Sequence, residues 1–114
     1  MNLDILRGEI WLLDLNPTLG REQSGTRPGL VVSDNIFNRG PADLIIVVPI
    51  TSKNKNIRSH VQIAKGEAGL TVDSYAKCED VRSVSKIRFI KKFGTVEHQT
   101  LISVEETLRF LMKL

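Results

Sequence analysis

Few residues of this sequence have the types and spacing that enzymes use for metal-dependent or covalent chemistry. The two histidines, His60 and His98, stand far apart, and neither belongs to a His-x-Glu or Cys-x-x-Cys pattern. The glycine-rich motifs that bind nucleotides and the Gly-x-Ser-x-Gly motif of hydrolases are also absent from the sequence. We therefore expect an enzyme of this sequence to need no metal and no cofactor, and to work with arginine, threonine, serine, glutamate or histidine side chains.

The composition predicts one soluble domain that spans residues 1–114. A chain of 114 residues with 41% hydrophobic content is large enough for one core and too short for two. No apolar run approaches the roughly 20 residues that cross a bilayer, and residues 1–8 lack the features of a signal peptide, so we expect a cytoplasmic protein. The single cysteine, Cys78, lies in a strand-like context, where a small buried thiol is expected.

Positive charge is concentrated in the middle of the chain. Residues 1–48 carry a net charge of −2, residues 49–96 carry +6 and residues 97–114 carry −1. Such a basic zone is typical of a surface that binds a polyanion or an acidic peptide, but a solvated face of lysines has the same composition. Charge alone therefore favours a nucleic-acid partner only weakly.

The first part of the chain predicts two strands around a long loop. Residues 9–15 (EIWLLDL) are rich in apolar and aromatic residues and end at a turn signal, so they predict a strand. Residues 16–27 contain proline, glycine and serine with few apolar residues, which indicates a long mobile connection. Residues 29–33 predict the second strand. Arg27 is therefore expected at a junction between loop and strand.

The strongest strand signal is the run of β-branched residues at 44–50 (LIIVVPI). Pro49 has no N–H to donate to a neighbouring strand, so we expect the strand to end, to bulge or to lie at an edge there. Thr51 follows at this irregular end, directly after Ile50.

The remainder of the chain predicts short strands and a final helix. Within residues 95–114, Leu101, Val104, Leu108 and Leu111 recur at spacings of three and four, as in a helix that packs on a core. We expect polar connections at 34–43, 52–59 and 65–73, a strand at 60–63, and one strand or two short strands at 75–84. Together the elements indicate a mainly β fold, a small and strongly bent barrel or sheet with a C-terminal helix.

Five short motifs in order resemble the MazF/PemK family. They are RGEIW at 7–11, DLNP at 14–17, GREQ at 20–23, GTRP at 25–28 and VPIT at 48–51. Each motif alone is weak evidence, but their order over about 45 residues makes chance agreement improbable. The resemblance implies an SH3-like barrel of the CcdB/MazF/Kid type with a C-terminal α-helix, in agreement with the expected element order.

The resemblance also implies a function. Members of this family are homodimeric toxins of type II toxin–antitoxin systems that cleave single-stranded RNA, mostly mRNA, at short sequences, and an acidic antitoxin covers the RNA-binding groove. The catalytic pair of the family corresponds to Arg27 and Thr51 here. The loop at 16–27 would help to gate the site. The motifs further suggest RNA-binding or supporting roles for Glu22, Gln23, Gly25, Thr26, Ser52, His60 and Arg82.

The implied chemistry needs a group that stabilises negative charge. When a 2′-hydroxyl attacks the neighbouring phosphate, the transition state gains charge and the products are a cyclic phosphate and a 5′-hydroxyl. Arginine offers fixed donors that match phosphate oxygens, and a threonine hydroxyl adds a donor without charge. Because arginine stays protonated at neutral pH, we assign Arg27 mainly to charge stabilisation. The general base stays open, with Glu22 and His60 as candidates.

Structural roles compete with these functional ones. Arg27 could instead anchor a loop, and Thr51 could cap a strand. Trp11 is expected to anchor the core or a dimer contact, and His98 is expected at the surface. The basic run at 86–92 alternates cations with apolar residues, which fits a nucleic-acid groove and an ordinary half-buried strand equally well.

Two other functions stay open at this point. A CcdB-like toxin that poisons gyrase would share the fold and cleave nothing, but the Arg27-Pro28 pair and Thr51 argue against it. A non-catalytic module that binds RNA or an antitoxin would also keep the fold. Cleavage of RNA in the presence of a chelator distinguishes the nuclease from both alternatives.

Overall fold

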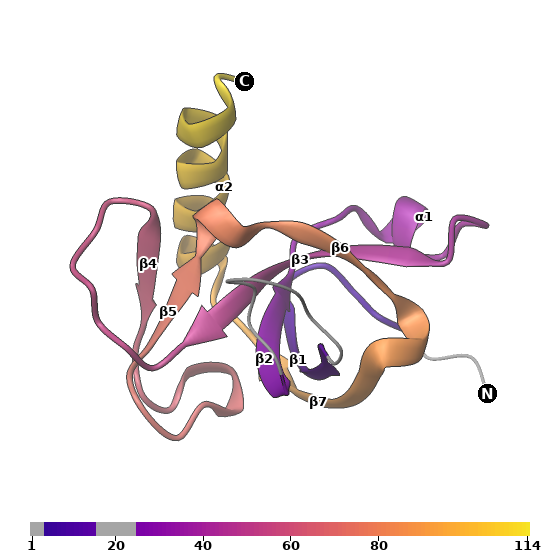
Figure 1. Cartoon of the computed structure of the whole chain (residues 1–114), viewed down its shortest axis with the longest axis horizontal. Helices are drawn as coiled ribbons and strands as arrows, with labels where there is room; N and C mark the ends of the chain where they lie inside the picture. Colours follow the sequence, from indigo (N-terminus) through magenta and orange to yellow (C-terminus); the bar gives the residue numbers. More distant parts are fainter. Residues whose placement is uncertain (1–3, 16–24) are drawn as a thin grey trace.

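The computed structural model of the chain describes residues 4–15 and 25–114, and these residues form a sheet of seven strands with a C-terminal helix (Figure 1). The strands are β1 (Glu9–Asp14), β2 (Thr26–Val31), β3 (Leu44–Thr51), β4 (His60–Ile63), β5 (Ser74–Lys77), β6 (Arg82–Ser85) and β7 (Phe89–Thr95). The helices are α1 (Asn35–Asn38) and α2 (His98–Met112), with 3-10 turns η1 (Glu67–Gly69), η2 (Cys78–Asp80) and η3 (Lys86–Arg88).

The central strand of the sheet is β3, which pairs with three other strands. All pairings are antiparallel, in the order β4-β5-β3-β2-β1-β7, and β6 pairs with β3 as well. The sheet is strongly curved, and the turn η3 connects its edge strands β6 and β7 (Figure 1). The predicted mainly β fold with a strongly bent sheet and a closing helix is confirmed.

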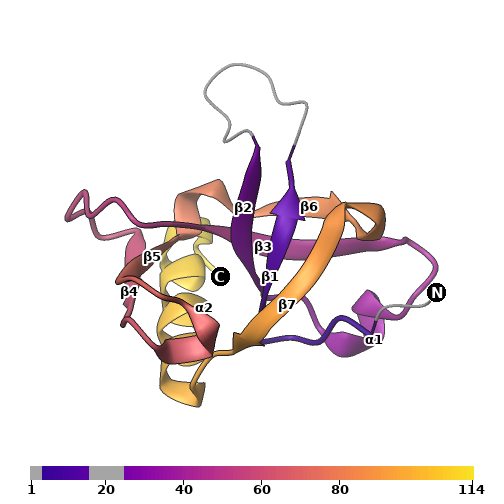
Figure 2. The same ribbon diagram turned by 90° about the horizontal axis from the view of Figure 1, so that it is seen from below.

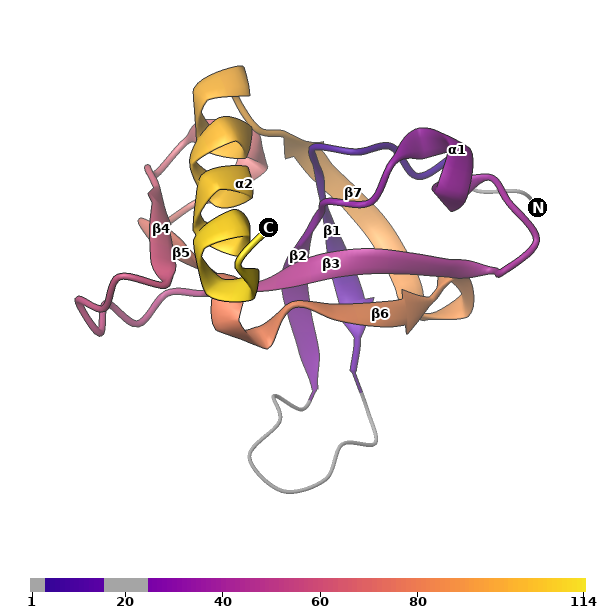
Figure 3. The ribbon, with the colours of Figure 1, turned by 90° about the horizontal axis from the view of Figure 1, so that it is seen from above.

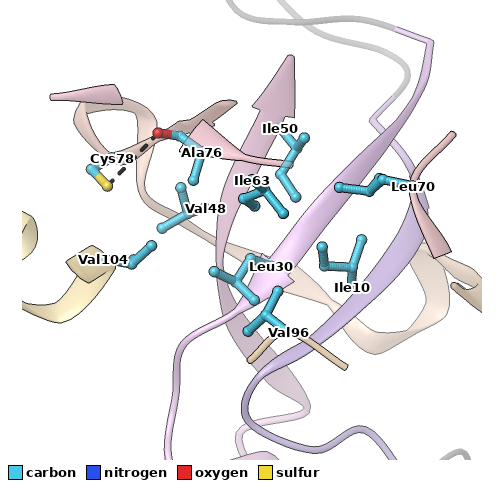
Figure 4. Close-up of a cluster of buried hydrophobic side chains, with 10 residues drawn as sticks. All are labelled: Ile10, Leu30, Val48, Ile50, Ile63, Leu70, Ala76, Cys78, Val96 and Val104. Atoms are coloured by element: carbon cyan, nitrogen blue, oxygen red, sulfur yellow. Dashed lines mark hydrogen bonds between the residues drawn. The ribbon is translucent and has the colours of Figure 1, made fainter. Parts of the chain in front are cut away.

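Alternation along the strands sends side chains to two hydrophobic cores on opposite faces of the sheet. Val48 and Ile50 of β3 face one core, and Ile45 and Val47 of the same strand face the other. The first core also takes Val104 of α2 and Cys78, and Figure 4 shows its side chains pointing toward one another. Cys78 is completely buried, as the sequence predicted, and burial raises the pKa of its thiol to about 12.

The C-terminal helix covers the first core, where it lies beside β4 and β5 (Figure 3). Val104 is buried, and Leu101 and Leu108 pack against the same cluster, which confirms the predicted helical face. Leu111 is the exception, because 41% of it is exposed near the end of α2. Among the described helices, none is long and apolar enough to cross a membrane.

Two predicted segments need correction. The second strand covers Thr26–Val31 rather than 29–33, because Thr26, Arg27 and Pro28 all pair with β1. The polar segment at 34–43 contains the short helix α1, whose first turn is capped by the Asp34 carboxylate accepting from the N–H of Ile36 at 2.8 Å. Pairing with β1 extends β2, and the Asp34 cap stabilises α1. Hydrophobic periodicity in the sequence reports neither effect.

Pro49 neither ends its strand nor lies at an edge. It pairs with Gly29 of β2, and β3 continues to Thr51. On its other side β3 changes partner, since the pairing with β6 ends at Val47 and the pairing with β5 begins at Ile50. Pro49, which has no N–H, thus lies between the residues of β3 that pair with β6 and those that pair with β5. Fewer backbone donors are needed at this position.

The RGEIW motif ties β1 to the rest of the molecule. Arg7 donates to the carbonyl of Val32 and pairs with Glu105 of α2. Trp11 is buried and packs edge-on against Phe89, with ring centroids 5.8 Å apart, which confirms the expected core role. The buried Glu9 carboxylate accepts from the indole N–H of Trp11 at 3.0 Å and pairs with the Lys92 ammonium at 2.8 Å.

The Glu9 carboxylate should make the protein less stable as the pH falls into the acid range. Burial raises its pKa, but bonds from Lys92, the Leu6 N–H and Trp11 together hold that pKa below its usual value of 4.5. A lowered pKa stabilises the fold above the unfolded-state value, and this contribution disappears as pH falls through the folded-state value. Urea unfolding should therefore show that Glu9→Gln destabilises the protein at pH 7 and much less near pH 3. The exposed Glu106→Gln is the matched control, and an equal loss at both pH values would contradict the assignment.

Candidate active site

Arg27 and Thr51 are brought together by the pairing of β2 with β3. Gly29 lies opposite Pro49, and two residues further along the antiparallel strands are Arg27 and Thr51. Arg27 and Thr51 thus lie just beyond the last paired residues of these two strands, and both line one pocket. Figure 2 shows this end of β2 beside β1 and away from α1. The sequence identified both residues, and their proximity follows from the strand register.

The pocket at this strand end encloses about 580 Å³. We call it the Arg27–Thr51 pocket. Its lining combines apolar side chains with hydroxyl groups and cations, a mixture typical of ligand sites. The lining residues are Arg27, Pro28, Ile50, Thr51, Ser52, Gly69, Leu70, Thr71, Val72, Ser74, Lys91, Lys92 and Phe93.

The charged groups in this lining are all positive. Arg27 from β2 and Lys91 and Lys92 from β7 contribute cations, whereas no aspartate or glutamate is among the described lining residues. Lys92 is partly neutralised by Glu9, but none of the ion pairs between described residues involves Arg27 or Lys91. The pocket is thus suited to an anion such as a phosphate.

Thr51 has a hydroxyl that can donate a proton into the pocket. Its Oγ1 accepts a hydrogen bond from the backbone N–H of Lys53 at 3.2 Å, which uses a lone pair and leaves the O–H available. On the other side of β3, Thr51 pairs with Tyr75 of β5, so its backbone is held in the sheet. The pairing positions the hydroxyl at the pocket without using it.

One wall of the pocket depends on a close approach of two backbones. Gly69 has a φ of +77°, and a Cβ there would lie 2.4 Å from the carbonyl oxygen of Phe93. A Cβ on Gly94 would likewise lie 2.7 Å from the backbone of Ala68. These two glycines let η1 pack against β7, so that Leu70 and Phe93 line the same pocket.

Arg82 lies at a second pocket, of about 420 Å³. Its other lining residues are Leu15, Pro49, Glu79, Asp80, Val81 and Ser83. Arg82 pairs with Val47, and alternation along β3 puts Val47, Pro49 and Thr51 on one face of the sheet. Arg82 therefore shares a face with Thr51, but it does not line the Arg27–Thr51 pocket.

The structure places His60 away from this chemistry. Its side chain is only 3% exposed, and Nε2 lies 2.9 Å from a carboxylate oxygen of Glu79. Burial raises the pKa of Glu79, but hydrogen bonds from Ser59, its own backbone and His60 outweigh that effect and lower it. His60 is not part of the Arg27–Thr51 pocket lining, so it is poorly placed to be the general base there.

The other candidate residues have varied positions. Ser52 is exposed and lines the Arg27–Thr51 pocket. Gly25 has a φ of +78° and accepts a hydrogen bond from Leu15, while Thr26 is exposed and pairs with Asp14. Neither Gly25 nor Thr26 is among the described lining residues. Glu22, Gln23 and most of the loop at 16–27 lie outside the described residues.

Sequence reasoning missed part of the pocket lining. The basic run at 86–92 was recognised without being assigned to the site, and the strand β7 shows that Lys91 and Lys92 line it. The alternation of cations with apolar residues in this run is the sequence feature that could have assigned it to the site. No comparable feature marks the segment 69–72 or Phe93 as part of the pocket. Within residues 4–15 and 25–114, no three metal-binding side chains gather.

Comparison with known proteins gives a consistent result. The sequence model for "PemK-like, MazF-like toxin of type II toxin-antitoxin system" matches residues 6–112. Endoribonuclease MazF9 of Mycobacterium tuberculosis is 34% identical over 113 residues, which cover 95% of this chain and 96% of that protein.

Two solved structures share the fold. MazF from Deinococcus radiodurans aligns with a TM-score of 0.87 at 24% identity, and the alignment covers 99% of this chain and 100% of that one. An endoribonuclease from a mycobacterial species, solved in complex with its cognate antitoxin, aligns with a TM-score of 0.81 at 22% identity over 96% of both chains.

Proposed function

The chain belongs to the PemK-like, MazF-like toxins of type II toxin–antitoxin systems, and we propose that its Arg27–Thr51 pocket is a metal-independent endoribonuclease site. The observation that carries the proposal is the meeting of Arg27 and Thr51, with Lys91 and Lys92, in a pocket whose described lining has no carboxylate. The substrate is single-stranded RNA, chiefly mRNA in the cytoplasm, because an unpaired strand can present a phosphate and its neighbouring bases to such a pocket.

The reaction is an attack of a ribose 2′-oxygen on the adjacent phosphorus. The new P–O bond forms as the bond to the 5′-oxygen breaks, which leaves a 2′,3′-cyclic phosphate and a 5′-hydroxyl. Arg27 donates two hydrogen bonds to the non-bridging oxygens, where negative charge accumulates in the transition state. Thr51 donates a hydrogen bond from its hydroxyl to the same group.

The proton of the attacking 2′-hydroxyl must pass to a base. The described lining of the pocket offers neither a carboxylate nor an imidazole, and Arg27 is better suited to stabilise charge than to accept a proton. Glu22, outside the described residues, keeps its place as a candidate base. A water molecule in the pocket can also carry the proton to solvent, and the protonated base or water gives a proton to the departing 5′-oxygen, which becomes the 5′-hydroxyl.

The test uses purified protein, defined single-stranded RNA and an excess of EDTA. We expect discrete fragments, with cyclic phosphate at one new end and a 5′-hydroxyl at the other, both assigned by mass spectrometry. Fragments with 5′-phosphate ends, or RNA left intact by folded protein, would contradict the proposal. Addition of Mg²⁺ should not increase the rate beyond the effect of ionic strength.

We further propose that the protein is a homodimer and that an acidic antitoxin covers the Arg27–Thr51 pocket. The mycobacterial endoribonuclease with the same fold was solved with its cognate antitoxin, and the positive pocket here is complementary to acidic side chains. Light scattering should give twice the chain mass. An adjacent gene for a small acidic protein should encode the inhibitor of the cleavage reaction.

Lys91 should contribute to RNA binding through charge. It is exposed on β7, lines the pocket and has its ammonium 5.7 Å from the centroid of the Phe93 ring. Lys91→Gln should weaken binding similarly for all RNA sequences, and the slope of log affinity against log salt should decrease by about 1. Lys113→Gln, at the exposed end of the chain, is the control. An unchanged salt slope would remove Lys91 from the interface.

A further inference from the structure

Much of the lining of the Arg27–Thr51 pocket is apolar. Its apolar residues are Phe93, Leu70, Ile50, Pro28 and Val72. Ser52, Thr71 and Ser74 belong to the same lining, and the Ser74 hydroxyl donates to the carbonyl of Val72 at 3.0 Å. A phosphate alone does not need such a surface, because burying apolar area against an anion gives no favourable interaction.

The register of β2 and β3 places the two catalytic candidates and their apolar neighbours on opposite faces of these strands. On β2 and β3, alternation places Arg27 and Thr51 on one face and Pro28 and Ile50 on the other. Because residues from both faces line it, the pocket borders both faces of these strand ends.

Phe93 is the aromatic side chain of this lining. It is half-buried, packs against the first core and belongs to the pocket lining. Lys91, two residues earlier on the same face of β7, lies over the same ring. An aromatic ring beside a cation, next to hydroxyl groups, matches the surface on which proteins stack an unpaired nucleobase.

We propose that Phe93 forms a subsite for one nucleobase, that of a nucleotide flanking the cleaved bond, and so determines sequence preference. The inference rests on the endoribonuclease function proposed above and adds a specificity-determining residue to it. The base stacks on Phe93, and the exposed Thr71 of the same lining offers a hydroxyl group to its polar edge. A pocket of about 580 Å³ has room for the base and its ribose.

The experiment compares wild-type protein with Phe93→Tyr and Phe93→Leu on a pool of randomised single-stranded RNA, and sequencing of the 5′-hydroxyl ends gives the preference at each position. Tyrosine keeps a ring for stacking, whereas leucine keeps the apolar packing of the core and loses the ring. We expect Phe93→Leu to lose discrimination at one position beside the cleaved bond, and Phe93→Tyr to retain it. For an oligonucleotide of the preferred sequence, KM should rise roughly 5- to 100-fold in Phe93→Leu, with a smaller change in kcat.

The control is Phe37→Ala, an exposed phenylalanine on α1 that lines neither pocket described above. It should keep the wild-type preference and KM. The inference is overturned if Phe93→Leu, folded and active, keeps the wild-type preference at every position, or if its loss is uniform across positions. Failure of the proposed function looks different, because wild-type protein and Phe37→Ala would then both leave the RNA intact.

Discussion

Replacing Arg27 by alanine is expected to lower the rate of RNA cleavage by about a thousandfold or more at saturating substrate. The guanidinium is proposed to donate two bonds to the phosphate oxygens in the transition state, and loss of one such donor already costs about 10²- to 10³-fold. Arg27→Lys keeps the charge without the paired donors, so we expect an intermediate rate. Single-turnover cleavage of a fluorescent oligonucleotide measures both effects.

The arginine prediction has a matched control. Arg39 is also exposed, and its ion pair with Asp4 at 3.3 Å has little effect on stability because both groups are exposed to solvent. Arg39→Ala should cleave at the wild-type rate. Arg27→Ala should unfold at the wild-type temperature, since none of the ion pairs between described residues involves Arg27. Wild-type toxicity of Arg27→Ala at equal expression would remove this residue from the mechanism.

Replacing Trp11 by alanine is expected to give a large loss of stability, about 3–5 kcal/mol, without a direct effect on the chemistry. The indole is 6% exposed, packs against Phe89 and donates to the buried Glu9 carboxylate. Its removal leaves a cavity and deprives that carboxylate of a donor. Urea unfolding should give the free energy, and the melting temperature should fall by roughly 10–25 °C.

A neighbour on the same strand provides the comparison for Trp11. Leu12 is only half-buried, so Leu12→Ala should cost less than Trp11→Ala. Per folded molecule, Trp11→Ala should cleave RNA at close to the wild-type rate, since Trp11 does not line the Arg27–Thr51 pocket. A free energy of unfolding within 1 kcal/mol of wild type would contradict this prediction. It would show that the core containing Trp11, Ile45 and Val47 tolerates the cavity.

The motifs that revealed the family therefore separate into two groups. Residues of the RGEIW motif connect β1 to α2 and β7 through Arg7, Glu9 and Trp11, which is a structural role. Arg27 and Thr51, from the motifs GTRP and VPIT, line the pocket. The resemblance to the family rests on both groups of residues equally. Only the contacts in the structure distinguish the structural residues from those that line the pocket.

Much of the fold was predictable from periodicity. The β-branched run at 44–50 and the spacing of Leu101, Val104 and Leu108 predicted β3 and α2, because burial of one face leaves a regular pattern. The start of β2 was not predictable, since Thr26 and Arg27 are exposed and belong to the strand only through pairing with β1. The helix α1 covers only Asn35–Asn38, too short to show a period.

The site was predictable in part. Arg27 and Thr51 were identified by resemblance, but their approach depends on the register of β2 against β3, which no spacing along the chain reports. Phe93 and the segment around Gly69 come from distant parts of the chain and meet through a backbone contact. The position of His60 does not favour its predicted role as a base, because its partner is Glu79 and it does not line the pocket.

A single substitution in the substrate tests the central claim most directly. An oligonucleotide of the preferred sequence, with 2′-deoxyribose only at the nucleotide whose 2′-hydroxyl attacks, is incubated with the wild-type protein in EDTA. If the Arg27–Thr51 pocket promotes attack by that hydroxyl, the oligonucleotide should bind with nearly unchanged affinity and remain uncut, while the all-ribose strand is cleaved. Cleavage of the deoxy-substituted strand at the same bond would contradict the mechanism.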